Sequence, residues 1–164
     1  MIKPLFSKLI VAVNGSQNSI HAAMYAILMA KQYHSRIKFI YVVDTAAIKT
    51  LTLSKFLLKD EGESIKSGLL VDGEKNLAYV EKLAKDKGIR VETEIRQGVV
   101  WSEIIASADD YKADAIVIGG RNSTNMKSLI RNEAGSDTSA IIGSAHCSVI
   151  VAKEPYIEQF FKLA

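Results

Sequence analysis

Five short runs of apolar and β-branched residues, separated by segments whose apolar residues recur at helical spacing, constrain the fold of this chain most strongly. The runs are Lys8 to Val13, Ile37 to Val43, Arg90 to Gln97, Ala115 to Gly120 and Ser148 to Lys153. Nearly continuous apolar runs are typical of parallel strands that are buried on both faces. Strands that alternate with helices connect through right-handed crossovers. We therefore expect an α/β fold, a doubly wound, five-stranded parallel sheet with helices on both faces.

The segments between the runs predict the helices. Ser19 is the expected N-cap of the first helix, which ends near Tyr33. Gly88 follows the second helix where a left-handed C-cap belongs. The apolar spacing predicts the remaining helices over about 73–87, 101–111 and 137–143.

The length of 164 residues fits one domain over 1–164. Within it, residues 45–71 hold either a short helix or a mobile loop, and we interpret them as an insertion or mobile segment. Residues 154–164 form a short amphipathic tail.

Charge and hydropathy exclude several classes of partner. The net charge is +3, with basic and acidic residues interspersed, so we expect no nucleic-acid surface. No apolar run approaches the ~18 residues that span a bilayer. The apolar core of the N-terminal segment, Leu9 to Val13, is too short for a signal peptide. Cys147 is the single cysteine, which fits a reducing compartment, and we expect a cytoplasmic protein.

Ligands of such sheets bind beyond the carboxyl ends of the strands, where the strand order reverses. The fourth run ends in Gly119 and Gly120, followed by Arg121 and Asn122. Glycines let a backbone approach a ligand closely. The next helix opens with Gly135, Ser136, Asp137 and Thr138. A helix start offers free N–H groups to a phosphate. The alternative is a flexible loop with an ordinary Ser/Thr cap.

Two other loops lie at the same edge of the predicted sheet. Val13, a further candidate site residue, ends the first strand. Asn14, Gly15 and Ser16 follow it, where they could meet a ribose or base, or simply form a turn and a cap. Val42 and Val43 end the second strand, where the backbone could bind a purine edge or the side chains simply pack in the core.

Catalytic and metal-binding roles find little support. The three histidines, His21, His34 and His146, lack metal-ligand spacing, and no base adjacent in sequence activates Cys147. Neither a Walker loop nor a G-x-G-x-x-G motif occurs. We expect no metal site of the protein's own and no catalytic residue.

Several segments together resemble a known family. "LIVAVNGSQNS", "FIYVVD", "GVVWSEIIASADDYKADAIVIGGR" and "AGSDTSAIIGSAHCSVIVAK" are similar, in order, to the strands and loops of universal stress proteins. The likeness covers nearly the whole chain except residues 45–71 and the tail. It implies the adenine-nucleotide α-hydrolase-like form of the doubly wound fold. It also implies a homodimer through the last strand, residues 148–153.

Members of this family that bind ATP carry G-x2-G-x9-G-S/T after the fourth strand. By position, Gly119 matches the first glycine, Gly135 the third and Ser136 the Ser/Thr that holds phosphates. The adenine-contacting backbone falls on Val42, and the aspartate after the first strand falls on Asn14. The chain departs from this pattern at three points: Asn122 replaces the second glycine, twelve residues rather than nine separate it from Gly135, and Asn14 replaces the aspartate.

The resemblance implies a stress-response protein that binds ATP or another adenine nucleotide as a regulatory ligand, with Mg²⁺ only when ATP is bound. Hydrolysis would be slow at most, because no general base is evident. One alternative is a dimer of the same family that binds no nucleotide and acts as a protein-interaction module. A second alternative is an adenylating enzyme of the wider fold, which "NGSQNS" disfavours because it lacks the S-G-G-x-D-S pattern of such enzymes.

Overall fold

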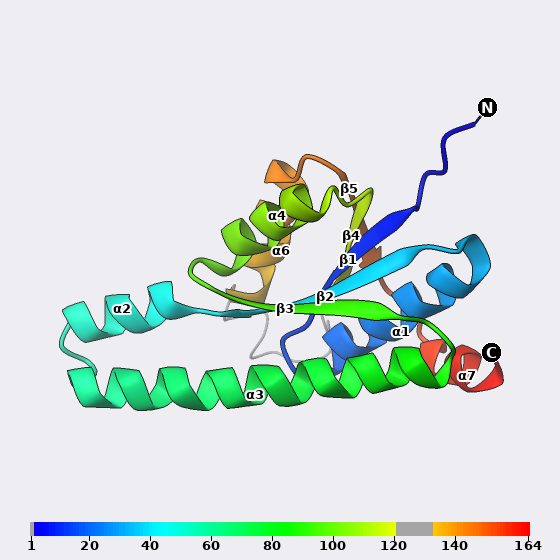
Figure 1. The fold of residues 1–164 in the computed structure, drawn as a ribbon. Coiled ribbons are helices and arrows are strands. Elements are labelled where there is room, and N and C mark those ends of the chain that lie inside the picture. Colours follow the sequence, from blue (N-terminus) through cyan, green and yellow to red (C-terminus); the bar gives the residue numbers. More distant parts are fainter. Residues whose placement is uncertain (1, 121–132) are drawn as a thin grey trace.

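The computed structural model describes residues 2–120 and 133–164, and the side chains of the second range from residue 137 onward. Strands and helices alternate along the chain (Figure 1). The strands are β1 (Lys8–Ala12), β2 (Arg36–Val43), β3 (Val91–Gln97), β4 (Ala115–Gly119) and β5 (Ser148–Ala152). The described helices are α1 (Gln17–Tyr33), α2 (Thr45–Leu53), α3 (Lys59–Asp86), α4 (Val100–Tyr111), α6 (Glu133–Ser144) and α7 (Ile157–Leu163).

The strands form one parallel sheet in the order β3-β2-β1-β4-β5. Helices α1, α3 and α7 cover one face, and α4 and α6 cover the other (Figure 1). The predicted fold class is confirmed. The chain runs outward from β1 to β3 and then crosses to β4, so the strand order reverses between β1 and β4.

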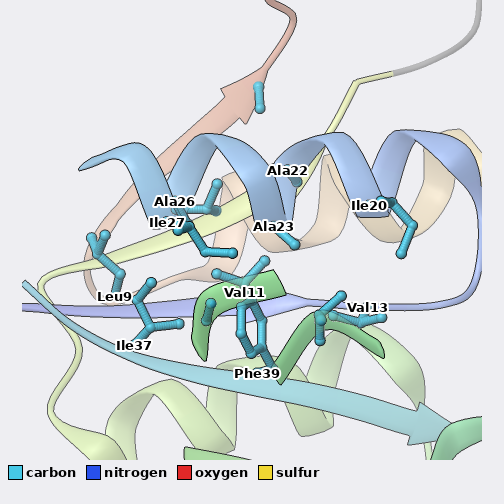
Figure 2. Packing of buried hydrophobic residues seen from close by; sticks show 14 of the residues in the cluster. Leu9, Val11, Val13, Ile20, Ala22, Ala23, Ala26, Ile27, Ile37 and Phe39 are labelled. Carbon is cyan, nitrogen blue, oxygen red and sulfur yellow. The ribbon is translucent and has the colours of Figure 1, made fainter. Parts of the chain in front are cut away.

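Alternating side chains of the sheet divide the core into two layers. Leu9 and Val11 of β1 point toward α1, whereas Ile10 between them belongs to the cluster with α4 and α6. Successive residues of a strand face opposite sides of the sheet, which explains this division. Figure 2 shows the first layer, where Ala22, Ala23, Ala26 and Ile27 of α1 meet Val11 and Phe39. The small alanines let α1 lie close to the sheet.

The helix boundaries differ from the predictions at several points. Ser16, not Ser19, caps α1, and its side chain accepts a hydrogen bond from the Ser19 N–H. Ser19 is buried one turn further on, where its hydroxyl donates to the Ser16 carbonyl. Helix α3 begins at Lys59 rather than near residue 73. Gly88 has φ +78°, as expected for a left-handed residue after a helix.

Residues 45–71 fold as α2 and the first half of α3, which project together beyond the sheet (Figure 1). The two helices touch at Gly62, where an added Cβ would lie 3.1 Å from Thr52 Oγ1. Leu53, Phe56 and Leu58 are exposed at the turn between the helices. The sequence analysis allowed either a short helix or a mobile loop for this segment. That the segment is an insertion remains a prediction.

The C-terminal tail forms α7, which packs on α1 and buries Ile157 and Phe161. Among the helices of the described residues, none is both long and apolar enough to cross a membrane.

Candidate functional site

A cavity of about 360 Å³ lies where the strand order reverses, beyond the carboxyl ends of β1, β2 and β4. Its wall includes Val13 and Asn14 after β1, Val42 of β2 and Gly119 of β4. Helices α4 and α6 contribute Ile104, Asp137, Thr138 and Ile141. The cavity therefore brings together residues from all three loops that the sequence singled out.

The loop after β1 is held by its own hydrogen bonds. Asn14 Oδ1 accepts from the Ser16 N–H at 3.0 Å, and the Asn14 N–H donates to Ser19 Oγ at 3.2 Å. Gly15 has φ +82°, which strains any other residue, and a Cβ there would lie 3.0 Å from Asn76 Nδ2 and would have to displace that side chain. The structure thus contains the turn and the helix cap that the sequence analysis gave as the alternative to a ligand contact for this loop. They leave Asn14 exposed at the cavity, with no hydrogen bond from its Nδ2 to the residues that the structure describes.

Val42 has a backbone edge that faces the cavity. In a parallel sheet, alternate residues direct their N–H and C=O groups to opposite neighbours. The Ile40 carbonyl accepts from the Val13 N–H at 2.8 Å, so Ile40 and Val42 face the β1 side. Strand β1 ends at Ala12, and no hydrogen bond joins it to the Val42 backbone within the described chain. Val42 thus offers one donor and one acceptor beyond the end of β1.

The two glycines at the end of β4 have structural partners. A Cβ on Gly119 would lie 2.5 Å from the Asn18 carbonyl oxygen, so glycine is required for α1 to lie against β4. The Gly120 carbonyl accepts from Asn18 Nδ2 at 2.6 Å, and the Gly120 N–H donates to the Ala152 carbonyl at 3.2 Å. Gly120 is therefore packed tightly against Asn18, and its backbone N–H is already bonded to Ala152 instead of being free for a ligand. The sequence analysis did not identify Asn18 as a site residue. Its position in the first turn of α1, directly after the loop that follows β1, could have indicated that it lies at the cavity.

Helix α6 starts at Glu133, so Gly135 and Ser136 lie within its first turn. The first four N–H groups of a helix have no partner inside the helix. Arg121 and Asn122 lie outside the described residues, as does the Ser136 side chain. The backbone of this turn is thus the part of the expected phosphate site that the structure describes at α6.

Asp137 brings a carboxylate to the cavity wall. Burial raises the pKa of Asp137, the nearby Asp44 raises it further, and a hydrogen bond from the Trp101 backbone N–H acts in the opposite direction. This contact links the first turn of α4 to α6. It also puts an acidic group where the sequence predicted a helix start that favours anions.

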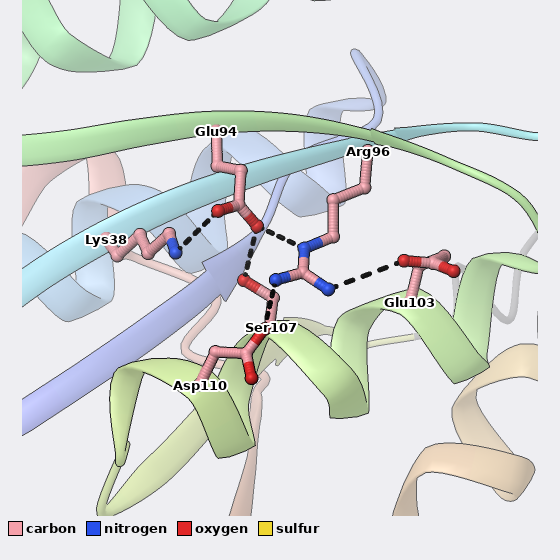
Figure 3. A network of polar contacts seen from close by, with 6 residues as sticks. All are labelled: Lys38, Glu94, Arg96, Glu103, Ser107 and Asp110. Carbon is pink, nitrogen blue, oxygen red and sulfur yellow. Dashed lines mark hydrogen bonds and ion pairs between the residues drawn. The ribbon is translucent and has the colours of Figure 1, made fainter.

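A separate polar cluster lies between the sheet and α4 (Figure 3). Glu94 accepts from Lys38 Nζ at 2.8 Å, from Ser107 Oγ at 2.9 Å and from Arg96 Nε. Arg96 also pairs with Glu103 and, at 2.6 Å, with Asp110. Every charge in the cluster has a partner, so we assign it a structural role. Lys38 and Arg96 were not anticipated, because strand periodicity alone predicts apolar residues at buried positions.

The histidines and the cysteine have local partners. His21 pairs with Glu158 and His146 with Asp109, each at 3.0 Å, and His34 is the left-handed C-cap of α1. Burial, followed by Asp109 and Asp114, raises the pKa of the half-buried Cys147 thiol. Within the described ranges, no group of three or more His, Cys, Asp or Glu side chains is arranged to hold a metal ion.

Comparison with known proteins agrees with this geometry. A model of the universal stress protein family matches residues 5–153. Universal stress protein MJ0531 of Methanocaldococcus jannaschii is 33% identical over 151 residues, which cover 92% of this chain and 84% of that protein.

Solved structures show the same fold. Universal stress protein UspA from Lactobacillus plantarum has a TM-score of 0.72 at 22% identity, over 90% of this chain and 98% of that one. The universal stress protein from Archaeoglobus fulgidus in complex with dAMP has a TM-score of 0.62 at 18% identity, over 91% and 99% of the two chains.

Proposed function

Because this chain belongs to the universal stress protein family, we propose that it binds ATP or another adenine nucleotide as a regulatory ligand in the stress response. The observation that carries the proposal is the cavity between β1 and β4, whose wall includes Val42, Asn14 and, from α6, Asp137 and Thr138. A structural relative from Archaeoglobus fulgidus was solved with dAMP, which supports an adenine nucleotide as the ligand.

The cavity suggests a place for each part of the nucleotide. The Val42 N–H and C=O suit the edge of a purine, which presents both an acceptor and a donor. Asn14 is positioned for the ribose hydroxyls. The backbone N–H of Gly135, which has no partner within α6, suits a phosphate. Mg²⁺ would enter with ATP, bound to the phosphate oxygens.

We propose a binding role rather than efficient catalysis, so any hydrolysis of ATP would be slow. Asp137 lies in the wall, but its carboxylate is committed to the Trp101 N–H and stands beside Asp44. We place the protein in the cytoplasm, in keeping with its single cysteine and mixed surface charge.

Native mass spectrometry of the purified protein, combined with a titration of ATP, tests the binding proposal. We expect one nucleotide for each chain and saturation below millimolar ATP. Absence of both a bound nucleotide and saturable binding at millimolar ATP would refute it.

One alternative function is favoured by a specific observation. The Asp137 carboxylate faces the cavity, and a negative charge there opposes a phosphate. Together with Asn122 and the longer loop, it fits a nucleotide-free dimer that acts as a protein-interaction module. A variant with Asn122→Gly and a loop shortened by three residues distinguishes the two. If that variant gains ATP binding that the parent lacks, the interaction module is the better description of the parent.

A homodimer through β5 belongs to the same proposal. Strand β5 is an edge of the sheet and pairs only with β4 among the described strands. Its residues Val149, Ile150 and Val151 are only partly buried in the single chain. An open parallel edge with apolar side chains is a ready template for a second copy.

A further inference from the structure

A second cavity, of about 380 Å³, lies next to the proposed nucleotide cavity, beyond the carboxyl ends of β4 and β5. The two cavities share Asn18 and Gly120. Lys153 and His21 line the second cavity together with Tyr25. The hydrogen bond between Asn18 Nδ2 and the Gly120 carbonyl therefore forms the boundary between the two spaces.

The order of the strands in the sheet shows how far this cavity lies from the proposed position of the nucleotide base. Strands β2, β1, β4 and β5 are consecutive neighbours in the sheet. Neighbouring strands lie ~4.8 Å apart, so the end of β5 is about 14 Å from the end of β2. A nucleotide with its base on Val42 and its sugar at Asn14 directs its phosphates across Gly119 and Gly120. A phosphate chain that continues in this direction reaches the end of β5.

Among the described residues that line this cavity, Lys153 carries the permanent positive charge. A Cβ on Gly120 would lie 3.0 Å from Lys153 Cγ and 3.6 Å from its Cε, so the lysine stem lies along Gly120. The side chain thus turns toward β4, away from the free edge of β5. Among the described residues, its ammonium has no hydrogen-bond or ion-pair partner.

The other charged groups around the cavity are engaged. His21 Nε2 and Gln17 Nε2 both contact Glu158 Oε1, at 3.0 and 2.8 Å. Glu154 Oε1 accepts from the Tyr156 N–H at 3.2 Å at the start of α7. These contacts hold two carboxylates in place, and neither carboxylate pairs with the Lys153 ammonium.

We propose that the second cavity is the subsite for the terminal phosphate of a nucleoside triphosphate, and that Lys153 is a specificity-determining residue for the length of the phosphate chain. This inference rests on the proposed nucleotide binding. It identifies the preferred ligand class as adenine nucleotides with several phosphates over the monophosphate. A monophosphate would end at Gly119 and Gly120 and would not reach Lys153.

Isothermal titration calorimetry with AMP, ADP and ATP tests the subsite. The proteins compared are the parent, Lys153→Ala, Lys153→Arg and, as a matched control, Lys85→Ala. Lys85 is an exposed lysine in the last turn of α3, at the opposite end of the sheet. The Lys153→Ala variant should bind ATP about tenfold more weakly, a change of ~1.4 kcal/mol. It should bind AMP within a factor of about two of the parent, while Lys153→Arg and Lys85→Ala keep the parent's preference for ATP.

Several results would overturn the inference. If Lys153→Ala weakens AMP and ATP equally, or neither, Lys153 does not sense the terminal phosphate. A parent protein that binds AMP as tightly as ATP would also contradict it, while leaving nucleotide binding itself intact. A folded parent that binds none of the three nucleotides rejects the proposed function and this inference together. Unchanged far-ultraviolet circular dichroism of each variant separates these results from loss of folding.

Discussion

Gly119 lies directly against Asn18, so closely that a Cβ on Gly119 would stand 2.5 Å from the Asn18 carbonyl oxygen. Because Asn18 Nδ2 also binds the carbonyl of Gly120, the first turn of α1 is fixed onto the end of β4 by two neighbouring contacts. The glycine that the sequence associates with a ligand is thus needed first for the packing of helix on strand.

Gly119→Ala should therefore destabilise the fold itself. The contact is with the backbone carbonyl of Asn18, which cannot move without shifting α1. We therefore expect a loss of about 1–3 kcal/mol in the free energy of unfolding. Urea denaturation measures this loss. Gly143→Ala is the matched control, because a Cβ at Gly143 in α6 meets nothing within 4 Å. Equal stability of the two variants would contradict the account of this contact.

Glu94 should make the stability depend on acid pH. Burial raises the pKa of Glu94, but the hydrogen bonds from Lys38, Arg96 and Ser107 outweigh it and lower the pKa from 4.5 to about 2. The ionised form is thus favoured by folding. Its contribution is complete above about pH 5 and is lost as the pH falls from 4.5 toward 2. After allowance for solvent screening we expect a contribution of about 1–2 kcal/mol.

Urea denaturation between pH 2.5 and pH 6 measures this contribution in the parent and in Glu94→Gln. The variant should be less stable at pH 6, because it leaves the buried Lys38 without its opposite charge. The difference should shrink as the pH falls. A constant difference across the whole range would show that Glu94 does not act through its charge.

Asn14→Asp should strengthen nucleotide binding if Asn14 meets the ribose. An aspartate can keep the turn that Asn14 Oδ1 makes with the Ser16 N–H, and it adds charge to a bond from a ribose hydroxyl. We expect ATP to bind about fivefold more tightly, a gain of ~1 kcal/mol. Calorimetry with 2′,3′-dideoxy-ATP is the control, since this ligand lacks both hydroxyls. A gain that persists with the dideoxy ligand would remove Asn14 from the ribose contact.

Val151→Pro should dissociate the proposed dimer without unfolding the chain. The Ala152 carbonyl faces β4, where it accepts from the Gly120 N–H, so Val151 directs its backbone to the free edge of β5. Proline removes the outward N–H and is tolerated on edge strands. Light scattering after size exclusion should give twice the chain mass of 18.0 kDa for the parent and the single mass for the variant. A dimeric variant, or a monomeric parent, speaks against a dimer through β5.

The strands were predictable because each is a local apolar run. The structure confirms β1 to β5 to within one residue at either end. The start of α3 was not predictable in the same way. In its first half only Leu69 and Leu70 pack against the core on the sheet, so residues 59–68 carry little of the apolar stripe by which a helix is recognised.

The site was only partly predictable. The loops after β1, β2 and β4 do meet at one cavity, as the topology of a parallel sheet requires. Contacts between residues far apart in the sequence could not be predicted from the local spacing of apolar and polar residues. Asn18 against Gly119, Asp137 against Trp101 and Lys153 against Gly120 each depend on the tertiary arrangement.

A crystal structure of the protein grown with ATP and Mg²⁺ would locate the nucleotide and so decide whether this cavity binds it. We expect density for the base at the Val42 backbone, with the phosphate nearest the ribose between Gly119 and the first turn of α6. A cavity that remains empty at millimolar ATP, or a nucleotide bound elsewhere on the molecule, would contradict it.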